Sequence, residues 1–505
     1  MRATFRSFLG GFQRGHRWTR LLGAAAAVSL VEACTVGPDY LRPPTNVAAD
    51  FKEQKVTDRK GWKGATPLDL QDRGAWWAVY KDPTLSDLAG QVELSNQTVA
   101  ASLAAYDMAK DVIREGQAGF FPTVTNSYSA TGSHQGSALS NAGRPVTSVA
   151  FSPAANATWD IDVWGRIRRT VESDAAAAQV SAADLQNAKL SAQAALATAY
   201  FELRATDALK KLYERTASAY RRTLEIVKNQ MTNGTASRAD VDTAETQLLA
   251  VEAQAINTGI NRAQYEHAIA VLVGKPPAGL TIPITSRFPT MVPAVPAGMP
   301  SRLLERRPDI AAAERTLQQY NALIGVAVAS FYPDLNLTAV FGFTGGTPLP
   351  ISAASEMWSV VGTATQPIFD GGLRSAQLEA AKAAYRQNVA NYRQTVLTAF
   401  QQVEDELAAL RILAQEAKKD QEAIKAAREA VEVYLNQYKA GTVAFTTVVT
   451  AQASQLTAEE SLLAVQESQL VASVALVEAL GGGWNADQLP DLKALAAVPT
   501  ITPPL

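Results

Sequence analysis

Two short stretches of the 505-residue sequence decide its architecture: NGTASRADV, residues 233–241, and AGTVAFTTV, residues 440–448. Each ends a helix-like run, from Gly165 to Gly234 and from the pair Gly371-Gly372 to Gly441, that contains no proline and no further glycine. At a rise of about 1.5 Å per residue, each run makes a helix on the order of 100 Å long. The core of one globular domain needs no such length. We therefore expect an extended molecule whose long helices reverse at the two glycines.

The two interruptions belong to an internal repeat. GFFPTV at 119–124 is echoed by SFYPDL at 330–335, VWGRIR at 163–168 by FDGGLR at 369–374, and VLVGK at 271–275 by EALGG at 478–482. The offsets between the copies lie between 206 and 211 residues. An offset this constant indicates a duplicated structural unit, so we expect the two halves of the chain to fold alike.

Each half contains the same order of elements. A helical pattern runs from Leu85 to Gln117 and again from Arg302 to Ala329, and a proline then ends it. Alternating strand-like segments follow Pro122 and Pro333, and return strands are predicted at Val149–Val163 and Trp358–Phe369. The sequence thus predicts four strands in two hairpins.

The strand lengths indicate a membrane barrel shared between chains. About 9–11 tilted residues suffice to cross a bilayer, and the return strands reach that length. Four strands cannot close, however, and an open edge is not tolerated in lipid. Bacterial barrels begin at about eight strands, so we expect a homo-oligomer. No run of 18 apolar residues follows residue 33, and no membrane-spanning helix is expected.

The N-terminus has the pattern of an export signal. Arg14, Arg17 and Arg20 precede a mostly apolar stretch that ends at Ala33, directly before Cys34, the single cysteine of the chain. The sequence around Cys34 resembles the lipobox of bacterial lipoproteins, in which this thiol accepts a diacylglyceryl group. Glu32 departs from the small or apolar residue usual there, so an ordinary signal peptide with an incidental cysteine is the alternative. The resemblance also implies that the absence of Asp after Cys34 favours outer-membrane sorting.

Composition and motifs exclude several other functions. The 46 basic and 48 acidic residues give a net charge of −2, which argues against a nucleic-acid partner. His16, His134 and His267 have no second ligand at metal-binding spacing, so we expect no metal and no cofactor. No set of nucleophile, base and orienting residue can be assembled, which speaks against an enzyme. The acidic run Glu404, Asp405 and Glu406 is interpreted as a solvated helix face rather than an ion-selective ring.

Several motifs together resemble the outer-membrane factor family, the TolC-like channels. They are Cys34 with TVGPDYLRPP (35–44), WDIDVWGRIR (159–168), QPIFDGGLR (366–374), the two glycine breaks and VEALGGGW (477–484). The closest match is to the lipoprotein branch that serves drug efflux pumps of the resistance-nodulation-division type.

The resemblance implies an α+β membrane protein. Three chains form a 12-stranded outer-membrane barrel, four strands from each, continued by a long periplasmic helical barrel. The expected parts are a signal peptide (1–33), a lipid-anchored extension (34–81), a first repeat with its tip at residue 234 (82–275), a linker (276–300), a second repeat with its tip at residue 441 (301–483) and a tail (484–505). The expected partners are two further copies, a periplasmic adaptor, an inner-membrane pump and outer-membrane lipid.

The resemblance also assigns a gate to the helix tips, Gly234 and Gly441. The family's bond between an aromatic hydroxyl and an aspartate falls on Tyr438 and Asp240, and the family's basic partner falls on Val443, with Arg238 near enough in sequence to substitute. Its acidic mouth positions fall on Thr447 and Thr450, which implies a neutral mouth that binds cations weakly. A helix cap at Asp240 and simple packing of Tyr438 are the alternative interpretation.

The resulting functional prediction is a passive exit duct for drugs or other small molecules, gated at the tips. A channel for type I protein secretion or for metal ions is the alternative within the family. A lipid-anchored periplasmic coiled coil is the alternative outside it, although the alternating LNLTAVFGF at 335–343 speaks against a protein without strands.

Overall fold

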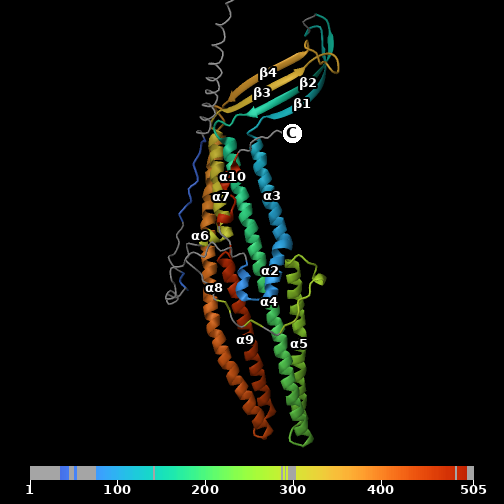
Figure 1. Ribbon diagram of the computed structural model, residues 1–505, viewed down its shortest axis with the longest axis vertical. Helices are drawn as coiled ribbons and strands as arrows, with labels where there is room; N and C mark the ends of the chain where they lie inside the picture. Colours follow the sequence, from blue (N-terminus) through green and yellow to red (C-terminus); the bar gives the residue numbers. More distant parts are fainter. Residues whose placement is uncertain are drawn as a thin grey trace, which may run out of the picture.

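The chain forms a long rod with a β-sheet at one end and two helical hairpins at the other (Figure 1). The computed structural model describes residues 35–44, 51–53, 75–139, 143–285, 288–289, 292–293, 303–483 and 486–497. The predicted signal peptide and Cys34 lie outside these residues. The two repeats are visible at once, because each contributes two strands and one long hairpin.

The hairpins have identical element lengths. Helix α4 spans Arg166–Thr232 and α8 spans Leu373–Lys439, each of 67 residues. Their return helices, α5 at Arg238–Leu272 and α9 at Phe445–Ala479, each have 35 residues. The two long helices and their reversal at the glycine breaks are confirmed. Within one chain the hairpins lie side by side, mainly through α4 and α9.

The sheet is antiparallel, with strand order β1-β2-β3-β4. The strands are β1 at Thr123–Gln135, β2 at Val146–Asp160, β3 at Asp334–Phe343 and β4 at Glu356–Thr365. Four strands in two hairpins are therefore confirmed. Both edge strands, β1 and β4, are exposed along their whole length, so each edge offers unpaired backbone groups to another chain.

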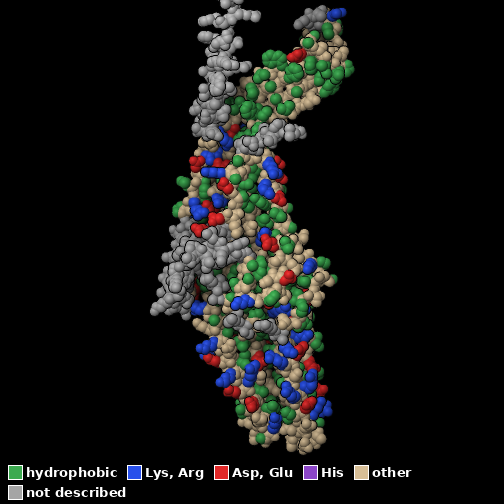
Figure 2. Space-filling model, viewed as in Figure 1, with side chains coloured by type: hydrophobic (Ala, Val, Ile, Leu, Met, Phe, Trp, Pro, Cys, Tyr) green, Lys and Arg blue, Asp and Glu red, His purple; other side chains and the backbone are tan. Residues whose placement is uncertain are grey.

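The register gives the sheet one polar and one apolar face. Thr123 pairs with Thr158 and Thr158 with Thr338, and Thr363 of β4, which pairs with Asn336, lies on the same face, so hydroxyl-bearing residues of all four strands share one face. The opposite face carries Trp159, which pairs with Leu337, and Phe341, which pairs with Trp358. Figure 2 shows few charged side chains over the sheet and many over the helices. One polar and one apolar face suit a barrel wall between water and lipid.

The return strands end earlier than predicted. β2 and β4 stop at Asp160 and Thr365, because residues 161–165 and 366–372 form tight corners into α4 and α8. Gly165 (φ +80) and Gly372 (φ +91) adopt the left-handed conformation where each helix begins.

The shorter helix of each repeat is broken where one continuous helix was predicted. In the first repeat, α2 (Pro83–Ser95) and α3 (Gln97–Ala118) meet at Asn96, whose side chain caps α3 by accepting hydrogen bonds from the amides of Thr98 and Val99. In the second, α6 (Leu303–Arg306) and α7 (Pro308–Ala329) are separated at Arg307, because Pro308 disfavours a helical residue before it.

Helix α9 departs from the expectation that no helix could span a membrane. By length and composition alone it is apolar enough, and it is the one such helix among the described residues. Its apolar side chains instead pack within the rod: Phe445 and Val448 near the tip, and Leu470 and Val474 farther up, are buried against the other helices. The high apolar content of α9 thus serves packing on several sides.

Two extended segments cross the long helices. The N-terminal segment runs along α4, α7 and α8, where Gly37 lies against Gly325, Asn321 donates a hydrogen bond to the Pro38 carbonyl at 2.8 Å, and Arg42 pairs with Glu314. The linker after α5 crosses α4, where Ile282 is buried. The N-terminal segment and the linker therefore both pack on the rod where the structure describes them.

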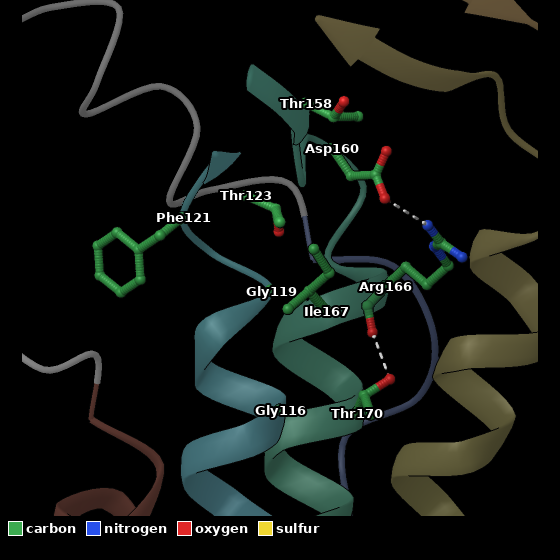
Figure 3. A pocket seen from close by; sticks show the side chains of 9 residues that line it. All are labelled: Gly116, Gly119, Phe121, Thr123, Thr158, Asp160, Arg166, Ile167 and Thr170. Carbon is green, nitrogen blue, oxygen red and sulfur yellow. Dashed lines mark hydrogen bonds and ion pairs between the residues drawn. The ribbon is translucent and has the colours of Figure 1, made fainter. Parts of the chain in front are cut away.

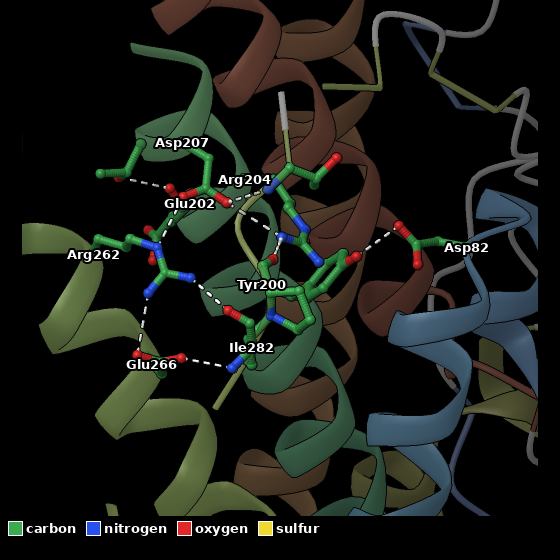
Figure 4. A network of polar contacts seen from close by, with 11 residues as sticks. Asp82, Tyr200, Glu202, Arg204, Asp207, Arg262, Glu266 and Ile282 are labelled. Carbon is green, nitrogen blue, oxygen red and sulfur yellow. Dashed lines mark hydrogen bonds and ion pairs between the residues drawn. The ribbon is translucent and has the colours of Figure 1, made fainter. Parts of the chain in front are cut away.

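The linker is fixed by a buried ionic network (Figure 4). Asp207 of α4 has a fully buried side chain and accepts hydrogen bonds from Arg204 at 3.2 Å and from Arg262 of α5 at 2.9 Å. The same two guanidinium groups donate to linker carbonyls, Arg204 to Pro283 at 2.8 Å and Arg262 to Ile282 at 2.6 Å. Because both charges are paired and hydrogen-bonded, their burial is tolerated.

Candidate functional site at the helix tips

The first tip is a tight reversal between α4 and α5. Gly234 has φ +72, and the amide of Thr235 donates to the Gln230 carbonyl at 2.8 Å, closing the helix end. No atom lies within 4 Å of a β-carbon built on Gly234. The glycine is therefore required by the backbone conformation and not by close packing.

The second tip repeats the first. Gly441 has φ +77, and the amide of Thr442 donates to the Gln437 carbonyl at 3.0 Å. The hydroxyls of Thr235 and Thr442 donate to those same carbonyls. The Gly-Thr pair thus supplies one left-handed residue and one side chain that satisfies a terminal carbonyl, and this explains its recurrence in both repeats.

A shared apolar cluster joins the two hairpins just above the tips. Tyr438 of α8 and Phe445 of α9 have ring centroids 5.2 Å apart, and both are buried against α4 and α5. The members from α4 and α5 are Tyr213, Ala217, Tyr220, Leu224, Val227, Val241, Ala244, Leu248 and Val251. The hairpins are therefore coupled at their ends by burial of apolar surface.

The bond between Tyr438 and Asp240 is absent from this single chain. The Tyr438 hydroxyl is buried without a hydrogen-bond partner. The Asp240 carboxylate instead accepts the amide and hydroxyl of Ser237 at 3.0 and 2.9 Å, completing a capping box at the start of α5. Burial, and then the negative charge of Asp240, raise the pKa of the Tyr438 hydroxyl.

The other predicted tip residues surround this pair. Arg238 forms an ion pair with Asp242, on its own helix α5, at 2.9 Å. Val443 is partly buried against the apolar cluster. Thr447 is half-buried, while Thr450 is exposed, with its hydroxyl donating to the Thr446 carbonyl at 2.9 Å. The structure thus shows Asp240 in a helix cap, Tyr438 in the apolar cluster and Arg238 in an ion pair with Asp242.

Polar side chains of α4 and α9 meet above the apolar cluster, and we call this line of contacts the polar seam. It was not predicted from the sequence. The Gln452 amide of α9 donates to the Thr223 hydroxyl of α4 at 3.1 Å, and higher up Ser191 of α4 donates to Glu478 of α9 at 2.8 Å. Glu467 of α9 and Glu202 of α4 lie between these two contacts. Burial, and then the charge of Glu202, raise the pKa of Glu467 to about 7.

The sequence signal for this seam is weak. Among the helices that the structure describes, Glu467 lies in the one apolar enough to span a membrane, between the buried residues Val465 and Leu470, so an acidic residue next to a core face could have been noticed. Its partner Glu202 cannot be found from sequence, because which positions of α4 and α9 face each other depends on how the two hairpins pack.

A hollow of about 440 Å³ lies at the other end of the rod, where the sheet meets the helices (Figure 3). It is bounded by α3, β1, β2 and the first turns of α4. Arg166 lies 3.9 Å from Asp160 and 3.9 Å from Asp334, so one guanidinium group joins the ends of β2 and β3. Phe121 lines the hollow from the α3 side and points away from Arg166.

The structure corrects the interpretation of the acidic run Glu404, Asp405 and Glu406 in α8 as a solvated helix face. Glu404 accepts the amides of Lys52 and Glu53 at 2.6 and 3.0 Å, so it holds the N-terminal segment against α8. Burial, and then the neighbouring charge of Asp405, raise the pKa of Glu406. The run is thus not a uniformly solvated face, because the N-terminal segment folds back over it.

A sheet with two open edges, continued by helical hairpins that reverse at one level, defines a channel-forming outer-membrane protein. The family model described as outer membrane efflux protein matches residues 88–275 and 299–482. The chain therefore belongs to the outer membrane efflux protein family, and the predicted fold class and outer-membrane location are confirmed. It is a TolC-like efflux channel, and three chains complete its barrel.

Individual relatives agree with this assignment. The chain is 29% identical over 478 residues to the toluene efflux pump outer membrane protein TtgC of Pseudomonas putida, covering 92% of this chain and 96% of TtgC. It is 26% identical over 471 residues to the cation efflux system protein CusC of Escherichia coli, covering 92% and 99%. The solved structure of the outer-membrane channel OprN superposes with a TM-score of 0.81 at 30% identity, covering 89% of this chain and 100% of OprN.

Proposed function

We propose that this channel is the exit duct of a tripartite pump that expels drugs or other small organic molecules. Its partners are a periplasmic adaptor and an inner-membrane pump of the resistance-nodulation-division type. The observation that carries this proposal is the pair of matched tips, where both hairpins end together on one apolar cluster. The similarity to TtgC, a toluene pump component, supports an organic cargo.

The gate lies at the tips in this proposal. Separation of the two hairpins there requires the shared cluster around Tyr438 and Phe445 to part, together with the hydrogen bond from Gln452 to Thr223 just above it. We assign Tyr438 and Asp240 to the closed state: a small rotation of α8 would give the unpartnered hydroxyl a charged acceptor. Such a bond is worth roughly 1.5–3 kcal/mol when sheltered.

Lipidation of Cys34 is part of the same proposal. Thr35, directly after it, contacts Gly165 at the corner between β2 and α4. The next residue, Val36, donates a backbone hydrogen bond to the Trp164 carbonyl at 3.2 Å. This corner is the level at which the barrel ends, so a diacylglyceryl group on Cys34 would meet the inner leaflet of the outer membrane.

Metal-ion efflux is the second candidate, and the similarity to CusC, a cation efflux component, favours it. The tips favour an organic cargo, since the mouth positions carry Thr447 and Thr450 in place of carboxylates. Export assays in a strain without its own duct, carrying this chain with its adaptor and pump, separate the two candidates. Restored resistance to solvents or drugs supports the proposal, and restored resistance to toxic metal cations alone overturns it.

A further inference from the structure

The loop that joins β3 to β4, residues 345–354, folds back over the sheet. It lies at the end of the sheet far from the helices (Figure 1), and a hydrogen bond of 2.8 Å from the Thr344 amide to the Ser355 carbonyl closes it. The Tyr128 hydroxyl of β1 donates to the Pro348 carbonyl of the loop at 2.9 Å. Because β2 lies between β1 and β3, this contact spans β2.

Tyr128 meets the loop on the apolar face of the sheet. Tyr128 pairs with Pro153, which lies six residues before Trp159 on β2. Side chains of a strand alternate between the two faces, so this even interval places Tyr128 on the face that carries Trp159. The Tyr128 ring also lies beside Phe151 of the same face, with ring centroids 6.3 Å apart.

Gly345 shows on which side of the sheet the loop itself lies. Gly345 bridges to Phe151 and continues the alternation of β3, four residues after Phe341. A β-carbon built on Gly345 would therefore point to the apolar face, where it would lie 2.7 Å from the β-carbon of Pro350. Pro350 is buried at this place. The loop thus packs on the apolar face, and a glycine leaves room for it.

The composition and hydrogen bonding of the loop suit a hydrocarbon environment. Residues 335–355 contain no charged residue. Leu349 and Ile351 are 70% and 61% exposed. Pro348 and Pro350 have no N–H to satisfy, and both of their carbonyls accept hydrogen bonds from side-chain hydroxyls. Lipid requires that backbone polar groups find partners within the protein.

We propose that residues 347–351 of this loop are inserted in the outer leaflet of the outer membrane, with Leu349 and Ile351 in contact with lipid acyl chains. The helices extend into the periplasm, so the loop lies at the extracellular end of the sheet. The occupant is lipid because the loop continues the apolar face of the barrel wall, on which Phe341 and Trp358 are exposed. Tyr128 holds the loop on this side, away from the polar face that surrounds the pore exit.

Spin labels on full-length trimers in vesicles of phosphatidylcholine and phosphatidylglycerol test the insertion. Leu349→Cys in a Cys34→Ser background offers one cysteine for a nitroxide. Its collisions with oxygen, which dissolves in lipid, are compared with its collisions with a water-soluble nickel chelate. Oxygen should dominate, as for Val360→Cys on the apolar face of β4. Nickel should dominate for the water-exposed controls, Arg144→Cys in the loop between β1 and β2 and Ser359→Cys on the polar face.

Two further variants make the test independent of one label. Ile351→Cys repeats the measurement at a second position of the loop. Tyr128→Phe removes the hydrogen bond to Pro348 and should raise the ratio of nickel to oxygen collisions of the label at position 349. Ser133→Ala is its matched control, because it removes a hydroxyl contact with Ser148 from the same strand, on the polar face.

The outcomes separate a loop in lipid from a loop in water. Assembled trimers in which the labels at positions 349 and 351 both favour nickel as strongly as the Arg144→Cys control would overturn the proposal. An unchanged collision ratio in Tyr128→Phe would overturn the role of the tyrosine. Trimer assembly of each variant is checked by heat-dependent gel migration. None of these results bears on what the channel exports.

Discussion

Arg204 and Arg411 occupy equivalent positions in the two long helices, and each holds an extended segment against the rod. They lie 207 residues apart, as do the first residues of α4 and α8. Arg204 donates to the linker carbonyl of Pro283 at 2.8 Å, and Arg411 donates to Glu53 of the N-terminal segment at 2.7 Å. The linker and the N-terminal segment are therefore held at equivalent places, the linker on the first hairpin and the N-terminal segment on the second.

The two arginine–carboxylate pairs that hold these segments differ in burial, and therefore in how much they stabilise the protein. The Arg204 and Asp207 side chains are 5% and 0% exposed, whereas Arg411 and Glu53 are 37% and 21% exposed. Arg204→Ala leaves Asp207 with one partner fewer in a buried site, so a loss of about 3 kcal/mol is expected. Arg411→Ala should cost about 1 kcal/mol or less. Thermal inactivation of purified trimers measures both, with Lys419→Ala, from an exposed pair with Glu422 on α8, as control. Equal losses for the two arginine variants would contradict the difference.

The gate assignment predicts that Tyr438→Phe and Asp240→Ala each raise single-channel conductance in planar bilayers. The closed state loses one hydrogen bond per copy, about 1 kcal/mol at a wet tip, and three copies change the closed-to-open ratio on the order of a hundredfold. The double variant should add little beyond the stronger single variant.

The alternative interpretation, in which Asp240 only caps α5 and Tyr438 only packs in the apolar cluster, predicts different conductance and stability for these variants. If the Tyr438 hydroxyl stays unpaired in the trimer, Tyr438→Phe removes a buried unsatisfied group, so conductance stays unchanged and thermal stability rises. Ser237→Ala serves as control, because it disturbs the same capping box without touching the tyrosine.

The neutral mouth predicts weak binding of multivalent cations. Trivalent cations at micromolar levels on the periplasmic side should leave the conductance of the natural channel unchanged. Thr447→Asp with Thr450→Asp should introduce block, because three copies then place a ring of carboxylates around the axis. Thr446→Asp, on another side of α9, is the matched control. Block of the natural channel would contradict a neutral mouth.

The raised pKa of Glu467 predicts that the stability of the folded channel depends on pH. Its folded pKa of about 7 lies above the ordinary value of 4.5, so the folded channel binds this proton more tightly than the unfolded chain does. Stability is therefore highest below about pH 4.5 and falls as pH rises to about 7. Glu467→Gln should stabilise the folded channel by about 1 kcal/mol at pH 8, after allowance for solvent screening, and so raise its melting temperature. At pH 4.5 the melting temperature should change little. A gain that is equal at both pH values would exclude the carboxylate as its cause.

Lipidation predicts that labelled palmitate enters the natural protein and not Cys34→Ser. Assembly of Cys34→Ser into trimers should be largely intact, since the barrel buries far more apolar surface in the membrane than one lipid anchor does. Gel migration of unheated samples measures assembly. Absence of label from the natural protein would exclude a lipid anchor at Cys34.

The sequence alone determined the architecture of this channel. Proline-free runs that end at Gly234 and Gly441 define the two long helices, and the alternating residues after Pro122 and Pro333 define the strands, because these are local properties of the backbone and of side-chain periodicity. The internal repeat then implied that both hairpins reverse at equivalent points, and the number of strands required several chains in one barrel.

Tertiary structure decided which residues of the two repeats meet. Sequence could not show that Tyr438 is buried beside Asp240 without a bond, that Glu467 faces Glu202, or that Glu404 holds the N-terminal segment, since these contacts depend on how the long helices are rotated about their axes. A small rotation, spread over the length of α4 or α8, exchanges the residues at the seam while leaving the helical pattern unchanged. The site therefore depends on packing between the hairpins, which the pattern within each helix does not specify.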